Sequence, residues 1–213
     1  QEELIEKDNA ALALTMSGYY LGLIFCIGGV IDGPSAGLSQ DLTDILIYGV
    51  LSIILLNVSA FINDLFILSK FKIKKEILED QNCGTGVVEF AVFTASGLNI
   101  FGAVYGHGGS VLTAIVFWAV GQLVLIAIGK YYNFIVQYDV HEYIEKDNVA
   151  VGVGFAGAIL AMGNLLRVAS ADDFVSWGVN LGEFAAFLVV GIIILPVARN
   201  LTDKVLLPGR SLA

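Results

Sequence analysis

The sequence predicts an all-α protein, a polytopic bundle of six transmembrane helices with no β-sheet. Hydrophobic residues make up 57% of the chain and charged residues 15%, with a mean hydropathy of +0.81, far more apolar than a soluble domain. Crossing the hydrocarbon core of a membrane takes about 20 apolar residues in a helix. Six segments come close to that length: 10–31, 45–69, 83–106, 111–137, 149–166 and 174–198.

An internal repeat precedes three of these segments. The letters Ile-Glu-Lys-Asp-Asn end at Asn9 and return ending at Asn148, and a looser copy ends at Asn82. Each copy leads from a charged stretch into an apolar run, and two apolar runs follow each copy. The spacing therefore predicts one membrane domain (1–213) of three tandem, parallel two-helix repeats: 1–75, 76–141 and 142–213.

Small residues coincide when the three asparagines are aligned, as in Ala11, Gly84 and Ala150. Small residues four apart let membrane helices approach closely, although such residues are also common in membrane helices generally. The candidate packing positions are Gly18, Gly22, Ala91, Ala95, Gly157 and Ala161.

The connections between the segments carry turn signals. The first helix ends at the Gly/Pro-rich stretch 32–37, and the second begins near Asp41 to Asp44. The third leaves through 106–109, the fifth turns at 170–173, and the sixth ends beside Pro196, which kinks or closes a helix.

Basic residues mark one side of the predicted membrane domain. Arg167 is alone near the other side, so the positive-inside rule places the repeated motif and both termini in the cytoplasm. The net charge of −9 is spread over the helix ends, which excludes nucleic acid as a partner and leaves the lipid bilayer. The residues on the motif side are Lys7, Lys70, Lys72, Lys74, Lys75, Lys146, Arg199, Lys204 and Arg210.

Polar residues within the apolar segments are the candidate functional side chains, because they are costly in lipid. Counting at roughly 1.5 Å per residue places Glu89 and Lys130 at one depth on adjacent helices, where they could pair. Asn99 and Gln122 match at a deeper level.

The third repeat has a similar deep pair, Asn164 and Glu183, with Arg167 one turn beyond Asn164. These polar residues form either interhelical bonds that hold the bundle together or a path in which Glu89 and Glu183 bind a cation or relay a proton. The first repeat has Met16 and Cys26 at the matching positions, which argues against a symmetric pore.

The three motif asparagines, Asn9, Asn82 and Asn148, also have two interpretations. Asparagine before an apolar run is typical of an N-cap. Alternatively, the three contribute to a cytoplasmic ring that binds between repeats or to a partner protein.

No catalytic constellation is evident, and we expect no enzyme activity, cofactor or metal. His107 and His141 fall on opposite sides of the predicted membrane domain. Cys26 and Cys83 differ in depth by roughly 24 Å, so we expect no disulfide between them.

The repeated Glu-x-x-Glu-x-x-Asn pattern at 3–11 and 142–150 resembles the YjfL-like bacterial inner-membrane family, known as domain of unknown function 350. The stretch 201–209 resembles that family's lead-in to a further motif helix. The resemblance implies a bacterial inner membrane and a loose association with envelope stress systems, without an established activity. Because members place a plain helix before each motif helix, we expect one more helix before Gln1 and one after Ala213.

Two functional hypotheses follow. The first is a non-enzymatic scaffold or accessory subunit of an oligomer or larger membrane complex. The alternative is an ion or proton channel or transporter that uses the intramembrane Glu, Lys and Arg side chains.

Overall fold

The computed structural model describes residues 2–33, 35, 37–68, 70, 72–136 and 138–206, and within these ranges the chain is helical with no strand. Six helices are long and apolar enough to cross a membrane, which confirms the predicted fold class. They are α1 (Ala10–Ile31), α2 (Leu38–Phe66), α4 (Cys83–Val104), α5 (Val111–Ile135), α7 (Val149–Ser170) and α8 (Trp177–Leu206).

Three helices, α2, α7 and α8, are longer than the apolar segments that predicted them, and α7 continues past 166 to Ser170. α2 begins at Leu38 and includes Asp41 in its first turn, where a carboxylate suits the positive end of the helix dipole. α8 continues through Pro196 to Leu206, so this proline does not end the helix. Hydropathy finds the part of a helix that lies in lipid, whereas backbone hydrogen bonding carries the helix beyond it.

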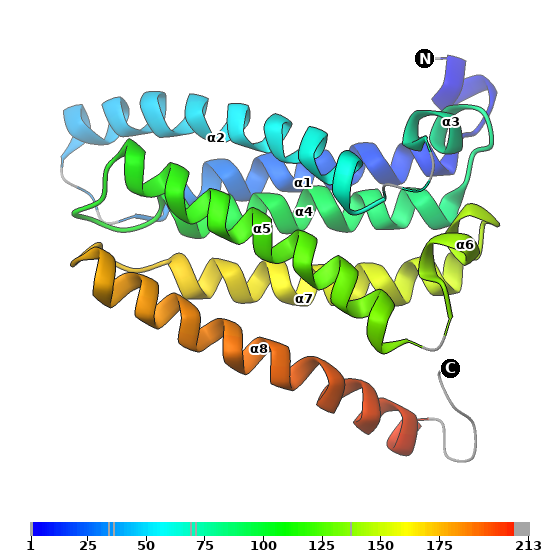
Figure 1. Cartoon of the computed structure of the whole chain (residues 1–213). Helices are drawn as coiled ribbons and strands as arrows, with labels where there is room; N and C mark the ends of the chain where they lie inside the picture. Colours follow the sequence, from blue (N-terminus) through cyan, green and yellow to red (C-terminus); the bar gives the residue numbers. More distant parts are fainter. Residues whose placement is uncertain are drawn as a thin grey trace.

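Three short helical segments were not predicted, and each precedes a long helix. They are a π-helical turn, η1 (Glu2–Glu6), and two α-helices, α3 (Ile73–Leu78) and α6 (Val140–Glu145). All three lie at the same end of the bundle (Figure 1). We call this the motif end, because Asn9, Asn82 and Asn148 start α1, α4 and α7 there.

The long helices alternate in direction (Figure 1). α1, α4 and α7, the motif helices, all run away from the motif end, and α4 packs between the other two. α2, α5 and α8, the return helices, come back toward the motif end. The three motif asparagines therefore lie on one side of the bundle. The repeat boundaries at 75 and 141 stay a prediction.

Glycine brings the backbones of the motif helices into contact. A Cβ atom at Gly18 of α1 would lie 2.6 Å from the carbonyl oxygen of Phe90 in α4. One at Gly152 of α7 would lie 2.7 Å from the carbonyl oxygen of Gly84. A larger residue at either place would push the helices apart.

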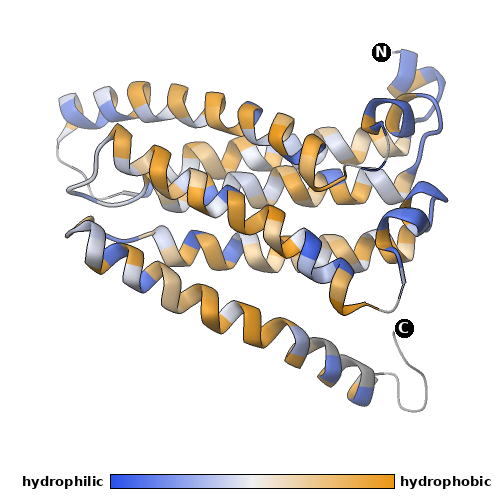
Figure 2. Cartoon of the chain, viewed as in Figure 1, coloured by the Kyte–Doolittle hydropathy of each residue, from blue (hydrophilic) through white to orange (hydrophobic). Residues whose placement is uncertain are grey.

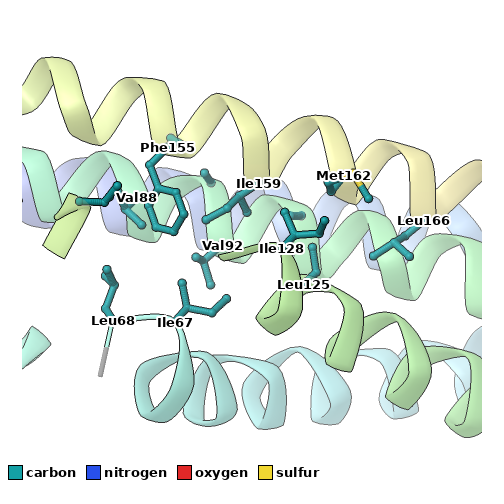
Figure 3. Packing of buried hydrophobic residues seen from close by; sticks show 14 of the residues in the cluster. Ile67, Leu68, Val88, Val92, Leu125, Ile128, Phe155, Ile159, Met162 and Leu166 are labelled. Atoms are coloured by element: carbon teal, nitrogen blue, oxygen red, sulfur yellow. The ribbon is translucent and has the colours of Figure 1, made fainter. Parts of the chain in front are cut away.

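The main apolar cluster fills the space between α4, α5 and α7. Phe155 and Ile159 of α7 pack with Val88 and Val92 of α4, and Ile128 of α5 completes the layer (Figure 3). Hydrophilic residues gather at the two ends of the bundle, and the helices are apolar along their middle (Figure 2). This distribution fits a bundle whose exterior contacts lipid.

Candidate functional site

Buried polar side chains meet where α2, α4 and α5 come together. Asn63 of α2 is at the centre: its amide nitrogen donates to the Ser96 hydroxyl of α4 at 3.0 Å, and its amide oxygen accepts from the Gln122 amide of α5. Asn63 and Ser96 are each 1% exposed. One asparagine therefore links three helices.

A second group of bonds continues from this centre. The indole N–H of Trp118 donates to the Ser59 hydroxyl at 2.8 Å, and the Asn99 amide donates to the carbonyl oxygen of Trp118 at 3.0 Å. The side-chain oxygens of Asn99 and Gln122 have no hydrogen-bond partner among the described residues. We call the following set the polar seam: Ser59, Asn63, Ser96, Asn99, Trp118 and Gln122.

Glu89 lies on α4 two turns from Ser96, on the side of the helix that faces the polar seam. The side chain is 3% exposed, and no described residue forms a hydrogen bond or ion pair with it. Asp64 of α2 interacts with it electrostatically. The residues of the polar seam form hydrogen bonds with one another. Glu89 instead has an acidic residue near it and no hydrogen bond to a described residue.

The expected pairing of Glu89 with Lys130 is not formed. Glu89 is buried, whereas Lys130 is exposed on α5, and no ion pair joins them. A residue count along a helix fixes the depth of a side chain but not the direction in which it leaves the axis. Asn99 and Gln122 do lie in one cluster, although they bond other residues and not each other.

The second expected pair, Asn164 and Glu183, is also not brought together. Both residues are exposed. Asn164 instead accepts a hydrogen bond from the Arg167 Nε at 3.2 Å, and the Arg167 guanidinium lies 5.3 Å from the centre of the Phe101 ring. Arg167 therefore belongs to a contact between α4 and α7 and not to a charged path through α8.

At the motif end, each asparagine caps its helix. The side-chain oxygens of Asn9, Asn82 and Asn148 accept from the backbone N–H three residues later, at 2.9, 2.7 and 3.2 Å. Two of the amides also reach the next unit: Asn9 donates to the carbonyl oxygen of Ile77 at 2.8 Å, and Asn82 to that of Ile144 at 2.7 Å. Asn9 and Asn82 therefore cap their own helices and also bond the turn before the next motif helix, whereas the cytoplasmic ring stays a prediction.

The residue before each motif asparagine adopts a positive φ, at Asp8, Gln81 and Asp147 (49°, 50° and 56°). A left-handed backbone conformation is unfavourable for a non-glycine residue. At one of the three positions, Asp147, it accompanies a hydrogen bond to another helix. The Asp147 carboxylate accepts a 3.0 Å hydrogen bond from the backbone N–H of Gly84. This hydrogen bond therefore links the start of α7 to the start of α4.

Two acidic residues near the motif end have shifted pKa values. Burial raises the pKa of Glu76 above its ordinary 4.5, and the 2.9 Å hydrogen bond from Asn82 opposes part of that rise. The hydrogen bond from Lys70 lowers the pKa of Asp139 below 3.8. Both groups belong to the connections between long helices.

Two cavities among the described residues are lined by neither Glu89 nor the polar seam. One, of about 440 Å³, lies at the end opposite the motifs and is lined by His107 and Asp172 among others. The other, of about 1020 Å³, is a mainly apolar groove along α7 and α8. Within the described residues, His, Cys, Asp and Glu form no group of three suited to a metal ion.

Sequence reasoning missed the α2 half of the site. Ser59, Asn63 and Asp64 lie in the segment 45–69, whose high mean hydropathy masks its few polar residues. Their signal is periodicity: Ser52, Ser59 and Asn63 share one face of α2, all buried.

The six-helix bundle and its buried polar contacts define a multi-pass α-helical membrane protein. The chain belongs to the family described as Domain of Unknown Function (DUF350), whose model matches residues 1–104 and again 107–213. This confirms the resemblance drawn from the motifs.

One curated relative is a UPF0719 transmembrane protein of Aquifex aeolicus (strain VF5), 23% identical over 177 residues. The match covers 82% of this chain and 63% of the relative, so the chain spans less than two thirds of that protein's length. No solved structure matches the chain.

Proposed function

We propose that the protein is a non-enzymatic membrane scaffold, an accessory subunit around which copies or other membrane proteins assemble. The supporting observation is the way in which the buried polar groups are used. Asn63 bonds Ser96 and Gln122 across direct helix contacts, and none of the three lines either of the two cavities described above. Such bonds hold a bundle together, whereas a conduction path needs polar groups that line a hydrated cavity.

Ion flux in proteoliposomes tests this function. Vesicles containing the protein are expected to leak protons and potassium ions no faster than empty vesicles, with a known channel protein as the positive control. Flux above the empty-vesicle rate that Glu89→Gln abolishes would overturn the scaffold assignment.

A proton or cation pathway is the second candidate, and Glu89 is the observation that favours it. Glu89 is a buried carboxyl group beside the acidic Asp64 and has no hydrogen-bond partner among the described residues. Such a group is costly to keep in a membrane and is a typical proton or cation site. Under this hypothesis, Glu89→Gln and Asp64→Asn each reduce flux. The matched control is Glu183→Gln, which removes an exposed carboxylate and leaves flux unchanged.

We also propose that the motif end faces the cytoplasm of a bacterial inner membrane and that the protein serves an envelope stress system. The excess of lysine at the motif end supports this orientation. In a chain with Cys26→Ala and Cys83→Ala, Asp80→Cys is expected to resist a membrane-impermeant maleimide added to intact spheroplasts, and Asp172→Cys is expected to react. The reverse labelling pattern would invert the topology.

A further inference from the structure

The cavity of about 440 Å³ at the end opposite the motifs is not used by the polar seam or by the proposed scaffold function. Residues at the ends of all six long helices contribute to its wall, together with the connections between them. Sites for small molecules typically have volumes of about 300–1,000 Å³. The cavity is therefore large enough for a small organic ligand.

One wall of this cavity carries carboxylates on α2. Asp41, Asp44 and Tyr48 all line it, and their spacing of three and four residues puts them on one face of the helix. The Asp44 carboxylate accepts a 3.0 Å hydrogen bond from the Gln40 amide and forms no ion pair within the described residues. A neutral donor of this kind holds the carboxylate in place without neutralising its charge.

A second wall carries another carboxylate, Asp172, in the connection from α7 to α8. It also forms no ion pair in the part of the chain that the structure describes. In Figure 1 the start of α2 and this connection lie on either side of the connection from α4 to α5. The negative charges are thus spread over two walls and do not converge on one point, as they would around a metal ion.

Two glycines hold the connection from α4 to α5 against the Asp172 wall. Gly106 and Gly108 adopt positive φ angles of 93° and 76°, which residues with a side chain rarely adopt. A Cβ atom at Gly106 would lie 2.5 Å from the carbonyl oxygen of Asp172. The backbone N–H of Phe174 donates to the carbonyl oxygen of His107 at 2.8 Å. Close backbone contact therefore sets the shape of this wall before any ligand binds.

Aromatic rings line the same cavity, among them Tyr105, Phe117 and Phe174. The rings of Phe117 and Phe174 both pack on Trp177, with centroid distances of 6.4 and 5.1 Å. The Tyr105 ring stacks on Phe101 at 6.0 Å. Rings that are held in this way offer fixed faces to ammonium and methylene groups.

The wall contains little that could neutralise its carboxylates. Among the described residues that line the cavity, His107 alone can carry a positive charge. Arg167 lies outside the lining and contacts Asn164 and the Phe101 ring. The hydroxyl oxygen of Ser170, a lining residue, is buried and forms no hydrogen bond within the described residues. Such a hydroxyl can accept a hydrogen bond from an ammonium group.

We propose that this cavity binds a soluble aliphatic polyamine, with ammonium groups at the two acidic walls and the methylene chain across the aromatic rings. The positive charges of a polyamine are spread along its length, as the carboxylates are spread over the cavity. An aminophospholipid headgroup also carries an ammonium group, but its phosphate would lie among aspartates with no Lys or Arg in the lining to offset it. The site goes beyond the scaffold function and does not depend on it.

Spermidine binding to the protein in phosphatidylcholine nanodiscs tests the site. Nanodiscs expose both ends of the bundle, so the result does not depend on the orientation in the membrane. The lipid has neither a net charge nor a primary amine. Isothermal titration calorimetry at neutral pH is expected to show saturable binding of one spermidine per chain. Heats equal to those of empty nanodiscs would overturn the proposal.

Charge-removing variants place the ligand in the cavity. Asp44→Asn and Asp172→Asn each remove one charge and keep the oxygen that accepts the existing hydrogen bond. Each is expected to weaken spermidine binding about threefold to fivefold, as for a partly exposed ion pair. The double variant is expected to lose about tenfold or more, because separated sites contribute additively.

Asp32→Asn is the matched control, since Asp32 is exposed at the same end of the bundle but does not line the cavity. It is expected to leave the affinity for spermidine unchanged. An equal loss in Asp32→Asn and Asp44→Asn would show general attraction to an acidic surface and would overturn the site.

The choice of ligand provides a second measurement. Spermidine is expected to bind about tenfold or more tighter than n-butylamine, whose one ammonium group reaches only one wall. Magnesium ions are expected to compete no better than sodium ions at equal ionic strength. Equal affinity for the two amines, or specific displacement by magnesium, would contradict a polyamine site.

The lipid composition separates the two sources of an ammonium group. Replacing part of the phosphatidylcholine by phosphatidylethanolamine is expected to leave spermidine binding unchanged. Loss of spermidine binding in these nanodiscs would assign the cavity to a lipid headgroup and overturn the soluble ligand.

Discussion

The side-chain amide of Asn82 donates a 2.7 Å hydrogen bond to the carbonyl oxygen of Ile144, 62 residues further along the chain. The same side chain caps α4 by accepting from the backbone N–H of Thr85. Asn82 is 2% exposed, so both bonds are shielded from water. One residue thus fixes the start of α4 and the turn that leads into α7.

Replacing Asn82 by alanine is expected to destabilise the monomer by about 2–4 kcal/mol, through loss of a cap and of the partner of a buried carbonyl oxygen. Asn148→Ala is the matched control and is expected to cost about 1 kcal/mol, because among the described residues the Asn148 side chain forms only the cap. Reversible unfolding in mixed micelles measures both. Equal costs would show that the bonds from the Asn82 amide to Ile144 and Glu76 add nothing.

Gly18→Leu is expected to destabilise the protein by about 1–3 kcal/mol or more, because the new side chain must displace the Phe90 backbone. Gly49→Leu on α2 is the control, since nothing lies within 4 Å of a Cβ atom there, and it is expected to change stability little. Thermal unfolding in detergent compares the two. A Gly18→Leu protein as stable as the parent would mean that α1 and α4 are not in backbone contact.

Trp118→Phe is expected to cost about 1 kcal/mol, because it removes the indole donor to Ser59 and leaves a buried hydroxyl without its partner. Trp177 is 40% exposed and makes no hydrogen bond through its indole within the described residues. Trp177→Phe should therefore leave the unfolding free energy nearly unchanged. If the two variants lose stability equally, the polar seam is not a stabilising feature of the bundle.

Glu76→Gln is expected to reduce the pH dependence of stability. Burial raises the pKa of Glu76 in the folded protein, so the folded state holds this proton more tightly than the unfolded state. The resulting stabilisation is present below the ordinary value of 4.5 and is lost as pH rises through the folded-state pKa. The Tm of the parent should thus fall as pH rises over this interval. The side chain of the Gln variant is neutral at every pH, so its Tm should not show this part of the fall.

The control for this experiment is Glu79→Gln, an exposed neighbour on the same short segment. It is expected to keep the pH dependence of the parent. A Glu76→Gln protein whose Tm follows the parent at every pH would show that Glu76 is solvated in the folded state.

The candidate site was only partly predictable, and Asn99 and Glu89 show why. A polar residue in an apolar run is visible in the sequence, so both were identified as intramembrane groups. Their partners were not, for two reasons. Asn99 donates to the backbone carbonyl oxygen of Trp118, which a pattern of polar side chains does not reveal. Asp64 approaches Glu89 from α2, which belongs to a different hairpin than the one used to match depths. Gly157 and Ala161 show the same limit: they share the small-residue pattern of Gly18 and Gly22, yet both are exposed in the part of the chain that the structure describes.

The sequence by itself determined the fold class, the six spans, the capping asparagines and the family, because hydrophobic length and helix capping depend on residues close together along the chain. Only the tertiary structure decided which polar groups meet, because that depends on the rotation of each helix about its axis and on which helices are neighbours. Rotation and neighbours are set by packing over the whole bundle. Hence Lys130 and Glu183 face outward, and Asn63 became the centre of the site.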